Sequence, residues 1–139
     1  MDFNTTGLLL FTTDGELANN LMHPSSQIER EYAVRVLGEV TKENIHTLLD
    51  GVELEDGLAK FTDIVDSGGR GANHWYHVVL MEGRNKEVRR LWESQDVQVT
   101  RLIRTRFGSY ILPRKKRVGQ FWRLEDKEIE ALQNSILSE

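Results

Sequence analysis

The sequence predicts an α+β fold, in which a mixed, mostly antiparallel sheet is flanked by three or four helices. Several segments alternate apolar and polar residues, which indicates half-buried strands. Others repeat apolar residues at spacings of three and four, which is typical of amphipathic helices. The two kinds of segment follow one another without the regular strand–helix rhythm of a doubly wound sheet. The 139 residues therefore fit one mixed domain, residues 1–139, without internal repeats.

The first strand is predicted at residues 8–11, where four large apolar residues follow Gly7. Such a continuous run is typical of a strand that is buried on both faces. Thr13 and Glu16 have the spacing of a capping box, so a short helix is expected to follow and to end at residues 23–24. The apolar face of that helix is expected to comprise Leu17, Leu21 and Met22.

The middle of the chain combines short strands with one helix. Residues 29–37 alternate and predict a half-buried strand. Thr41 and Gly51 are suited to begin and end a helix over residues 41–50. Two short strands are expected at residues 52–54 and 58–65. The three glycines of residues 67–73 indicate a mobile loop, which lacks the lysine and hydroxyl of a phosphate-binding P-loop.

The last part of the chain begins with a predicted strand at residues 75–81 and a helix that Asn85 would cap. The buried stripe of that helix is expected to comprise Val88, Leu91 and Trp92. Residues 97–107 alternate again and predict a strand that presents Arg104 and Arg106 on one face. The remaining elements are a loop at 108–119 with a basic tip at 114–117, a last strand at 121–124 and an amphipathic helix at 126–137.

Composition excludes several classes of function. The chain has no cysteine, so it forms no disulfide and offers no thiolate nucleophile. Its four histidines lack the spacing of metal ligands, and no metal site is expected. No apolar run approaches the roughly 20 residues that a membrane-spanning helix requires, so no membrane partner is expected. These features are typical of a cytoplasmic globular protein.

Charge is distributed unevenly along the chain. Residues 84–123 contain 12 Lys/Arg and 3 Asp/Glu, whereas the rest of the chain contains 6 and 19. A basic segment in a chain with a net charge of −4 indicates a face that binds a polyanion. A solvated helix face next to a charged loop would give the same composition, so charge alone leaves both interpretations open.

The start of the predicted helix after Asn85 is a candidate anion site. Arg84, Lys86 and Arg89 surround it in the sequence. Free backbone N–H groups at a helix start favour a negative charge, and guanidinium groups suit phosphate oxygens.

Four stretches of the chain carry recognisable motifs. Residues 2–15 read DFNTTGLLLFTTDG, and residues 30–34 read REYAV. Residues 82–90 read EGRNKEVRR, and residues 101–108 read RLIRTRFG. In this order they resemble the motifs D-x-x-T-x-G-L-L-L-x-T-x-D-G, K/R-x-Y-x-V, E-G-R-N-R-Q/E-V-R-R and R-L-x-R-x-x-x-G of bacterial ribosomal RNA pseudouridine synthases. The likeness is greatest to the members that modify large-subunit ribosomal RNA.

This resemblance implies an isomerase that converts a specific uridine of large-subunit (23S) ribosomal RNA to pseudouridine without a metal or an organic cofactor. Asp2 would be the catalytic carboxylate, acting as a nucleophile or as a base. Tyr32 would stack on the target base, and Arg89 would pair with Asp2. Leu102 and Ile103 would form the apolar wall of the uracil pocket. Further candidate substrate-binding residues are Arg84, Asn85, Lys86, Arg104 and Arg106.

The chain departs from the family pattern before Asp2. Family members carry a Gly-Arg-Leu tripeptide there, preceded by about half of the catalytic sheet and usually by a small RNA-binding domain. In this sequence Met1 takes the leucine position. The chain is therefore expected to be the C-terminal part of a catalytic domain, and uncovered sheet edges would favour a homo-oligomer.

Two other functions remain open from the sequence. A non-catalytic fragment would bind RNA through its basic segment, with an affinity that falls steeply with salt and without turnover. A metabolic enzyme would use the anion site at Asn85 for a small phosphate ligand. The metabolic interpretation ranks last because it makes no use of the basic tip at 114–117.

Overall fold

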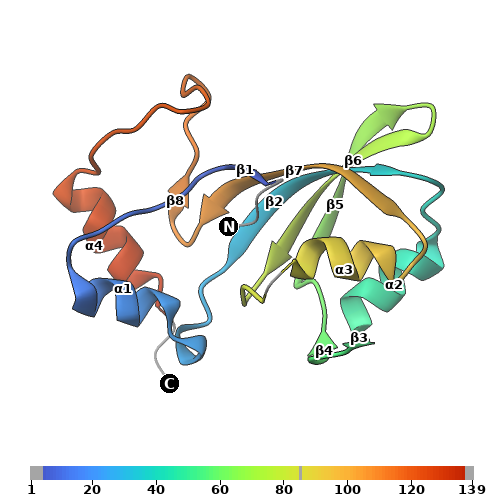
Figure 1. Ribbon diagram of the computed structural model, residues 1–139, viewed down its shortest axis with the longest axis horizontal. Coiled ribbons are helices and arrows are strands. Elements are labelled where there is room, and N and C mark those ends of the chain that lie inside the picture. The colour runs from blue at the N-terminus through green and yellow to red at the C-terminus, as the bar shows by residue number, and fades with distance from the viewer. Residues whose placement is uncertain (1–4, 85, 137–139) are drawn as a thin grey trace.

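A six-stranded sheet forms the centre of the computed structural model, which describes residues 5–84 and 86–136 (Figure 1). The strand order is β1-β7-β2-β6-β5, and β8 pairs with β7 outside this path. The strands are β1 (Thr6–Gly7), β2 (Arg30–Leu37), β5 (Asp63–Arg70), β6 (Asn73–Leu80), β7 (Gln98–Phe107) and β8 (Tyr110–Ile111). β1 and β7 are parallel, whereas the other pairs in this sheet are antiparallel.

Helices pack on one face of the sheet and beside one end of it (Figure 1). The face is covered by α2 (Lys42–Asp50) and α3 (Glu87–Glu93), next to a small hairpin of β3 (Val52–Leu54) and β4 (Gly57–Ala59). The end near β8 carries α1 (Gly15–Met22), a 3₁₀ helix (Pro24–Ser26) and α4 (Asp126–Asn134). This arrangement confirms the predicted α+β class. None of the described helices has the length and apolar character needed to cross a membrane.

Two helices follow the local signals of the sequence. The Thr41 hydroxyl accepts the Asn44 N–H at 3.1 Å, and the Asn44 side chain accepts the Thr41 N–H at 2.9 Å, so a capping box begins α2. Gly51 ends that helix with a φ of +133°, which favours glycine. On α3 the predicted stripe is confirmed, because Val88, Leu91 and Trp92 are all buried.

The main core lies between the sheet and the helices α2 and α3. Trp92 of α3 is fully buried, and its ring centroid lies 5.1 Å from that of Tyr76 and 5.9 Å from that of Phe61. These aromatic contacts join α3 to β6 and to the segment before β5, which fixes the helix against the sheet. A smaller second core comprises Leu8, Leu21, Ile28, Phe107, Tyr110 and Leu132.

The strand predicted at residues 8–11 is wrong. The Leu8 N–H still donates to the Arg104 carbonyl at 2.8 Å, but the chain then leaves the sheet. The Arg104 Nε–H donates to the Leu8 carbonyl oxygen at 2.7 Å, so the backbone ladder between β1 and β7 ends there. Leu8 enters the second core, whereas Leu9 and Phe11 are exposed.

Helix α1 begins one residue later than predicted. Asp14, and not Thr13, is its N-cap, and its carboxylate accepts the N–H groups of Glu16 and Leu17, each at 3.1 Å. An aspartate fulfils this capping role at least as well as a threonine. Met22 is 74% exposed, so the expected apolar face includes Leu21 but not Met22.

Three other expectations are wrong. Residues 67–73 are not a loop but the hairpin of β5 and β6, in which a Cβ on Gly69 would lie 2.3 Å from the Asn73 carbonyl oxygen. The predicted strand at 58–65 is divided between β4 and β5. Residues 121–124 form no strand, because Trp122 packs in the second core and donates its indole N–H to the Tyr110 hydroxyl at 2.7 Å.

Candidate functional site

Tyr32 and Arg104 lie side by side on the face of the sheet that carries α3. They are directly paired between β2 and β7, so their side chains point to the same side. The next pair along, Val34 and Leu102, belongs to the main core under α3. Tyr32 is half-buried and packs against this core. The predicted base-stacking residue therefore has a fixed ring at the border of the apolar interior.

The two residues of the predicted uracil wall point in opposite directions. Leu102 is paired with Val34 and is buried on the α3 side, whereas Ile103 is paired with Ala33 and lies on the other face. Consecutive residues of a strand alternate between faces. Of these two residues, Leu102 is therefore the one that shares a face with Tyr32.

The prediction that Arg104 and Arg106 share a face is wrong. Arg104 is paired with Tyr32 and Arg106 with Glu31, which are consecutive residues of β2, so a bulge at Thr105 reverses the alternation of β7. Arg106 forms ion pairs with Glu31 at 3.7 Å and Glu29 at 3.6 Å. Arg106 is thus neutralised on the opposite face.

Arg89 approaches the same region from α3. Its guanidinium donates to the Val99 carbonyl oxygen of β7 at 3.4 Å, and the side chain is half-buried. β1 runs parallel to β7, with Thr6 paired to Ile103. The predicted catalytic Asp2 lies outside the described residues, as does Asn85.

Arg30 and Phe107 complete the group around Tyr32. The Arg30 Cζ lies 5.1 Å from the Phe107 ring centroid, and the Arg104 Cζ lies 5.5 Å from it. Sequence reasoning did not select Arg30, although the K/R-x-Y motif places it two residues before Tyr32 and hence on the same face of β2. That spacing was the signal that could have identified it.

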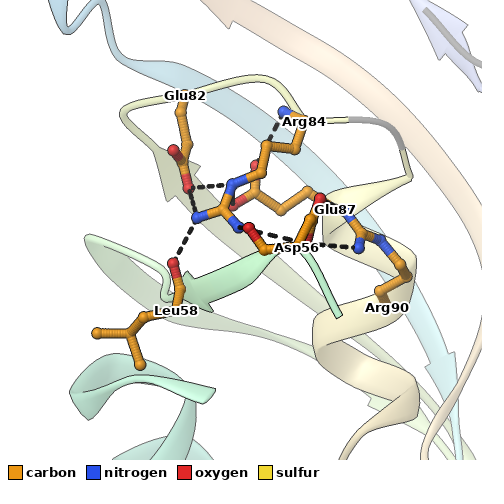
Figure 2. A network of polar contacts seen from close by, with 6 residues as sticks. All are labelled: Asp56, Leu58, Glu82, Arg84, Glu87 and Arg90. Atoms are coloured by element: carbon orange, nitrogen blue, oxygen red, sulfur yellow. Dashed lines mark hydrogen bonds and ion pairs between the residues drawn. The ribbon is translucent and has the colours of Figure 1, made fainter. Parts of the chain in front are cut away.

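Arg84 is the centre of a polar network between the β3–β4 turn and α3 (Figure 2). Its guanidinium contacts the carboxylates of Glu82 at 2.8 Å and Asp56 at 3.3 Å, and it donates to the Leu58 carbonyl. Arg90 binds the Asp56 carboxylate through two hydrogen bonds, at 2.8 and 3.0 Å. The hydrogen bonds from Arg90 lower the pKa of Asp56 to about 2. We call Asp56, Glu82, Arg84, Glu87 and Arg90 the ion-pair cluster.

Glu87 is the buried acid of this cluster, with only 2% of its surface exposed. Its carboxylate accepts the Arg84 backbone N–H at 3.1 Å, which fixes the start of α3. Burial, followed by the hydrogen bond with Glu82, raises the pKa of Glu87 to about 7. Burial alone would also raise the pKa of Glu82, but hydrogen bonds with Glu87 and Arg84 outweigh it and hold that pKa below its usual value.

At the helix start where an anion site was expected, the first helical residue is itself the acid Glu87. α3 has seven residues and begins at Glu87, whose carboxyl group accepts the N–H of Arg84, three residues before the helix. Arg84 is directed into the ion-pair cluster, and Lys86 is exposed in a left-handed conformation with a φ of +53°. The structure therefore does not bring Arg84 together with Tyr32 and Arg104 as a cation available to a ligand.

The basic tip at 114–117 lies in the long connection from β8 to α4. Arg114, Lys115 and Arg117 are exposed, as predicted. The Lys116 Nζ lies 4.4 Å from the centroid of the Trp122 ring, which holds one side of the tip. Within residues 5–84 and 86–136, no group of three or more His, Asp or Glu side chains could hold a metal ion.

Comparison with known proteins gives consistent matches. The sequence profile of the family described as RNA pseudouridylate synthase matches residues 1–94. Ribosomal large subunit pseudouridine synthase B of Pseudomonas aeruginosa is 61% identical over 137 residues, which are 98% of this chain and 36% of that protein. The protein of the same name from Vibrio vulnificus is 57% identical over 98% of this chain and 42% of its own length.

A solved structure supports the same relationship. The structure titled "Crystal structure of pseudouridylate synthase" superposes with a TM-score of 0.83 at 25% identity, covering 95% of this chain and 56% of that one. The chain thus spans about two fifths of the length of the curated relatives described above, and it matches them over almost all of its own.

Proposed function

This chain belongs to the RNA pseudouridylate synthase family, and we propose that its protein isomerises a uridine of large-subunit ribosomal RNA to pseudouridine. The observation that carries the proposal is the meeting of three separate motifs on β7. Tyr32 comes from the motif at residues 30–34, Arg89 from the motif at 82–90 and Arg104 from the motif at 101–108. Tyr32 is paired with Arg104, and Arg89 binds the Val99 carbonyl of the same strand.

The reaction needs no second substrate. The bond between ribose C1′ and uracil N1 breaks, the base turns, and C1′ bonds to C5. One proton leaves C5 and one proton ends on N1, so atoms and electrons balance within the nucleotide and its acid–base partner. A site for this reaction requires a carboxylate, a surface on which the base can be held, and cations that attract the strand.

We assign the carboxylate role to Asp2, paired with Arg89. Both residues stand in motifs that resemble those of the family, and Arg89 binds the Val99 carbonyl of β7, the strand that pairs with β1. The guanidinium of Arg89 would keep such a carboxylate ionised and oriented.

The remaining roles follow from the face shared with Tyr32. The Tyr32 ring would stack on the target base once that base has left its helix. Leu102, buried beside it, would supply the apolar floor. Lys86 and the basic tip would attract the RNA strand from solvent. No metal or organic cofactor enters this scheme.

The proposal is tested with the full-length protein and large-subunit ribosomal RNA, by chemical mapping of pseudouridine. Asp2→Asn should lower the rate of pseudouridine formation by more than about a hundredfold. The matched control is Asp50→Asn, which removes an exposed carboxylate at the end of α2 and should leave the rate unchanged. A wild-type rate in the Asp2→Asn protein would refute the assignment.

Two finer points belong to the same proposal. We propose a cytoplasmic reaction, because the relatives' names refer to the ribosomal large subunit. The homo-oligomer expected from the sequence stays a prediction, and size-exclusion chromatography of the full-length protein at low concentration would test it.

A further inference from the structure

Half-buried arginines in this fold differ in whether a carboxylate accompanies them. Arg84, Arg90 and Arg106 each form ion pairs. Arg30, Arg35 and Arg104 are also half-buried, yet among the described residues none of the three forms an ion pair with a carboxylate, and of these only Arg30 and Arg104 lie on the face of Tyr32. We propose that Arg30 and Arg104 together bind a phosphate group of the RNA strand, next to the base that stacks on Tyr32. This inference rests on the proposed function.

The two guanidinium groups converge on one aromatic ring. Arg30 is paired with Phe107, and Tyr32 with Arg104, so all four side chains share one face of β2 and β7. Both Cζ atoms lie within 5.5 Å of the Phe107 ring centroid. Phe107 is buried, so it supports both arginine side chains from within the second core.

Each arginine is held by the backbone and not by a charge. Arg30 Nη1 donates to the Ile28 carbonyl at 2.8 Å, and Arg104 Nε donates to the Leu8 carbonyl at 2.7 Å. Within the part of the chain that the structure describes, each guanidinium makes only this hydrogen bond, which orients it and leaves its other N–H donors for a ligand. A phosphate accepts several such donors at once, and paired guanidinium groups suit its geometry.

The local electrostatics favour an anion between them. Burial lowers the pKa of Arg30, and the nearby charge of Arg104 acts in the same direction, whereas Tyr32, Glu87 and Glu82 oppose it. The two carboxyl groups do not neutralise Arg30 by contact, because Glu82 binds Arg84 at 2.8 Å and Glu87 accepts the Arg84 N–H. Two partly desolvated cations beside each other are costly unless an anion accompanies them.

The position of the pair favours a phosphate of RNA over a free phosphate ion. Adjacent strands lie about 4.8 Å apart, so Arg104 stands next to the Tyr32 ring on the neighbouring strand. A nucleotide whose base stacks on Tyr32 brings its own phosphate groups close to the neighbouring Arg104. Inorganic phosphate would satisfy the same donors, and the experiment therefore separates the two sources.

The test measures binding of an oligouridine of about ten nucleotides to the full-length protein at salt concentrations between roughly 50 and 400 mM, a range over which the loss of phosphate contacts changes the affinity measurably. Arg30→Gln and Arg104→Gln should each weaken binding about five- to tenfold. Each should also reduce the slope of log affinity against log salt by about 0.7, the value for one phosphate contact on a single strand. The double variant should lose little more than either single variant, because one phosphate is shared.

Two further variants separate charge from folding. Arg30→Lys keeps a positive charge over Phe107 and should retain most of the salt dependence. Arg35→Gln is the matched control, because Arg35 also stands on β2 and over an aromatic ring, 5.9 Å from the Trp75 centroid, but on the opposite face. Arg35→Gln should bind oligouridine as the wild type does, and thermal melting should show each variant folded.

The outcomes are distinguishable from those of the proposed function. Unchanged affinity and salt slope in Arg30→Gln would overturn the inference even if the wild type forms pseudouridine. Loss of the slope in a protein that forms no pseudouridine would support the phosphate site and refute the function. The assignment to RNA would be overturned if millimolar inorganic phosphate displaced oligouridine at constant ionic strength and the salt slope were the same in the wild type and in Arg30→Gln.

Discussion

The ion-pair cluster and the Arg30–Arg104 pair are two neighbouring groups of arginines that differ in one respect. In the ion-pair cluster every guanidinium contacts a carboxylate, and the carboxylates come from the β3–β4 turn, the segment after β6 and α3 (Figure 2). At the Arg30–Arg104 pair the partners are backbone carbonyls and an aromatic ring. The difference teaches that partner type and position beside Tyr32, and not basic charge alone, separate arginines that hold the fold from arginines suited to a ligand.

The two groups are nevertheless connected. The ion-pair cluster fixes the segment before α3, because Arg84 is bound to Asp56, Glu82 and the Leu58 carbonyl. That segment determines where α3 begins, and α3 carries Arg89 to β7. The cluster therefore supports the site at a distance, while the Arg30–Arg104 pair would contact the strand directly.

The largest effect is expected from Gly7→Ala, which should disrupt the surroundings of Arg104 and leave the ion-pair cluster intact. Gly7 has a φ of +100°, and a Cβ there would lie 2.3 Å from the Arg104 carbonyl oxygen. The substitution should separate β1 from β7 and cost about 2–4 kcal/mol of stability. Denaturant unfolding measures the loss of stability, and the Leu8 N–H should exchange its hydrogen with solvent faster than in the wild type.

Gly15→Ala is the control for that experiment. A Cβ on Gly15 meets no atom within 4 Å, and the residue stands in the first turn of α1. Alanine there should change stability by less than about 0.5 kcal/mol. Equal losses in the two variants would contradict the view that close approach of β1 to Arg104 is what requires glycine at residue 7.

The sequence predicted most of the regular elements because their signals are local. The caps of α2 at Thr41 and Gly51 and the buried stripe of α3 are formed by residues within one or two turns. The run at 8–11 failed because its burial is decided by partners far along the chain: Leu8 meets the second core, and Phe11 meets solvent. The glycines at 67–73 indicated mobility, whereas they lie in the hairpin of β5 and β6, and Gly69 allows the two strands to approach closely.

The candidate site shows the same limit. A period-two pattern cannot reveal the bulge at Thr105, which moves Arg104 and Arg106 to opposite faces. Charge counting cannot reveal that Arg84 is neutralised by Asp56, because the turn that carries Asp56 is 28 residues earlier. The motifs selected Tyr32, Arg89 and Arg104, but only the register of β2 and β7 shows which of the arginines stand beside Tyr32.

A smaller effect is expected from Glu87→Gln, which replaces the buried acid of the ion-pair cluster by a side chain that does not titrate. The pKa of Glu87 is raised by burial to about 7 from a usual value of 4.5. The stability that its protonated form provides is fully present below pH 4.5 and is lost as pH rises through 7. Glutamine does not titrate and can still accept the Arg84 N–H. Between pH 5 and 8 the wild type should therefore lose about 2–3 kcal/mol relative to Glu87→Gln.

Urea unfolding at a series of pH values measures this difference. Glu93→Gln on the same helix is the control, because Glu93 is exposed and its replacement should give a stability curve parallel to that of the wild type. A curve for Glu87→Gln that is also parallel to the wild type would show that the buried carboxyl group does not titrate in this range.

The smallest effect is expected from Asp56→Asn, which makes the ion-pair cluster resemble the Arg30–Arg104 pair. The substitution removes the carboxylate that binds Arg90 through two hydrogen bonds and also contacts Arg84, so the net charge of the cluster becomes more positive by one. If neutralisation is what keeps this cluster from binding RNA, affinity for oligouridine should rise about twofold and the salt slope should steepen. Glu53→Gln is the matched control, because it removes an exposed carboxylate from the same hairpin without releasing an arginine, and it should change affinity less. Equal gains in the two variants would mean that only the overall charge matters, and the distinction between paired and unpaired arginines would then fail.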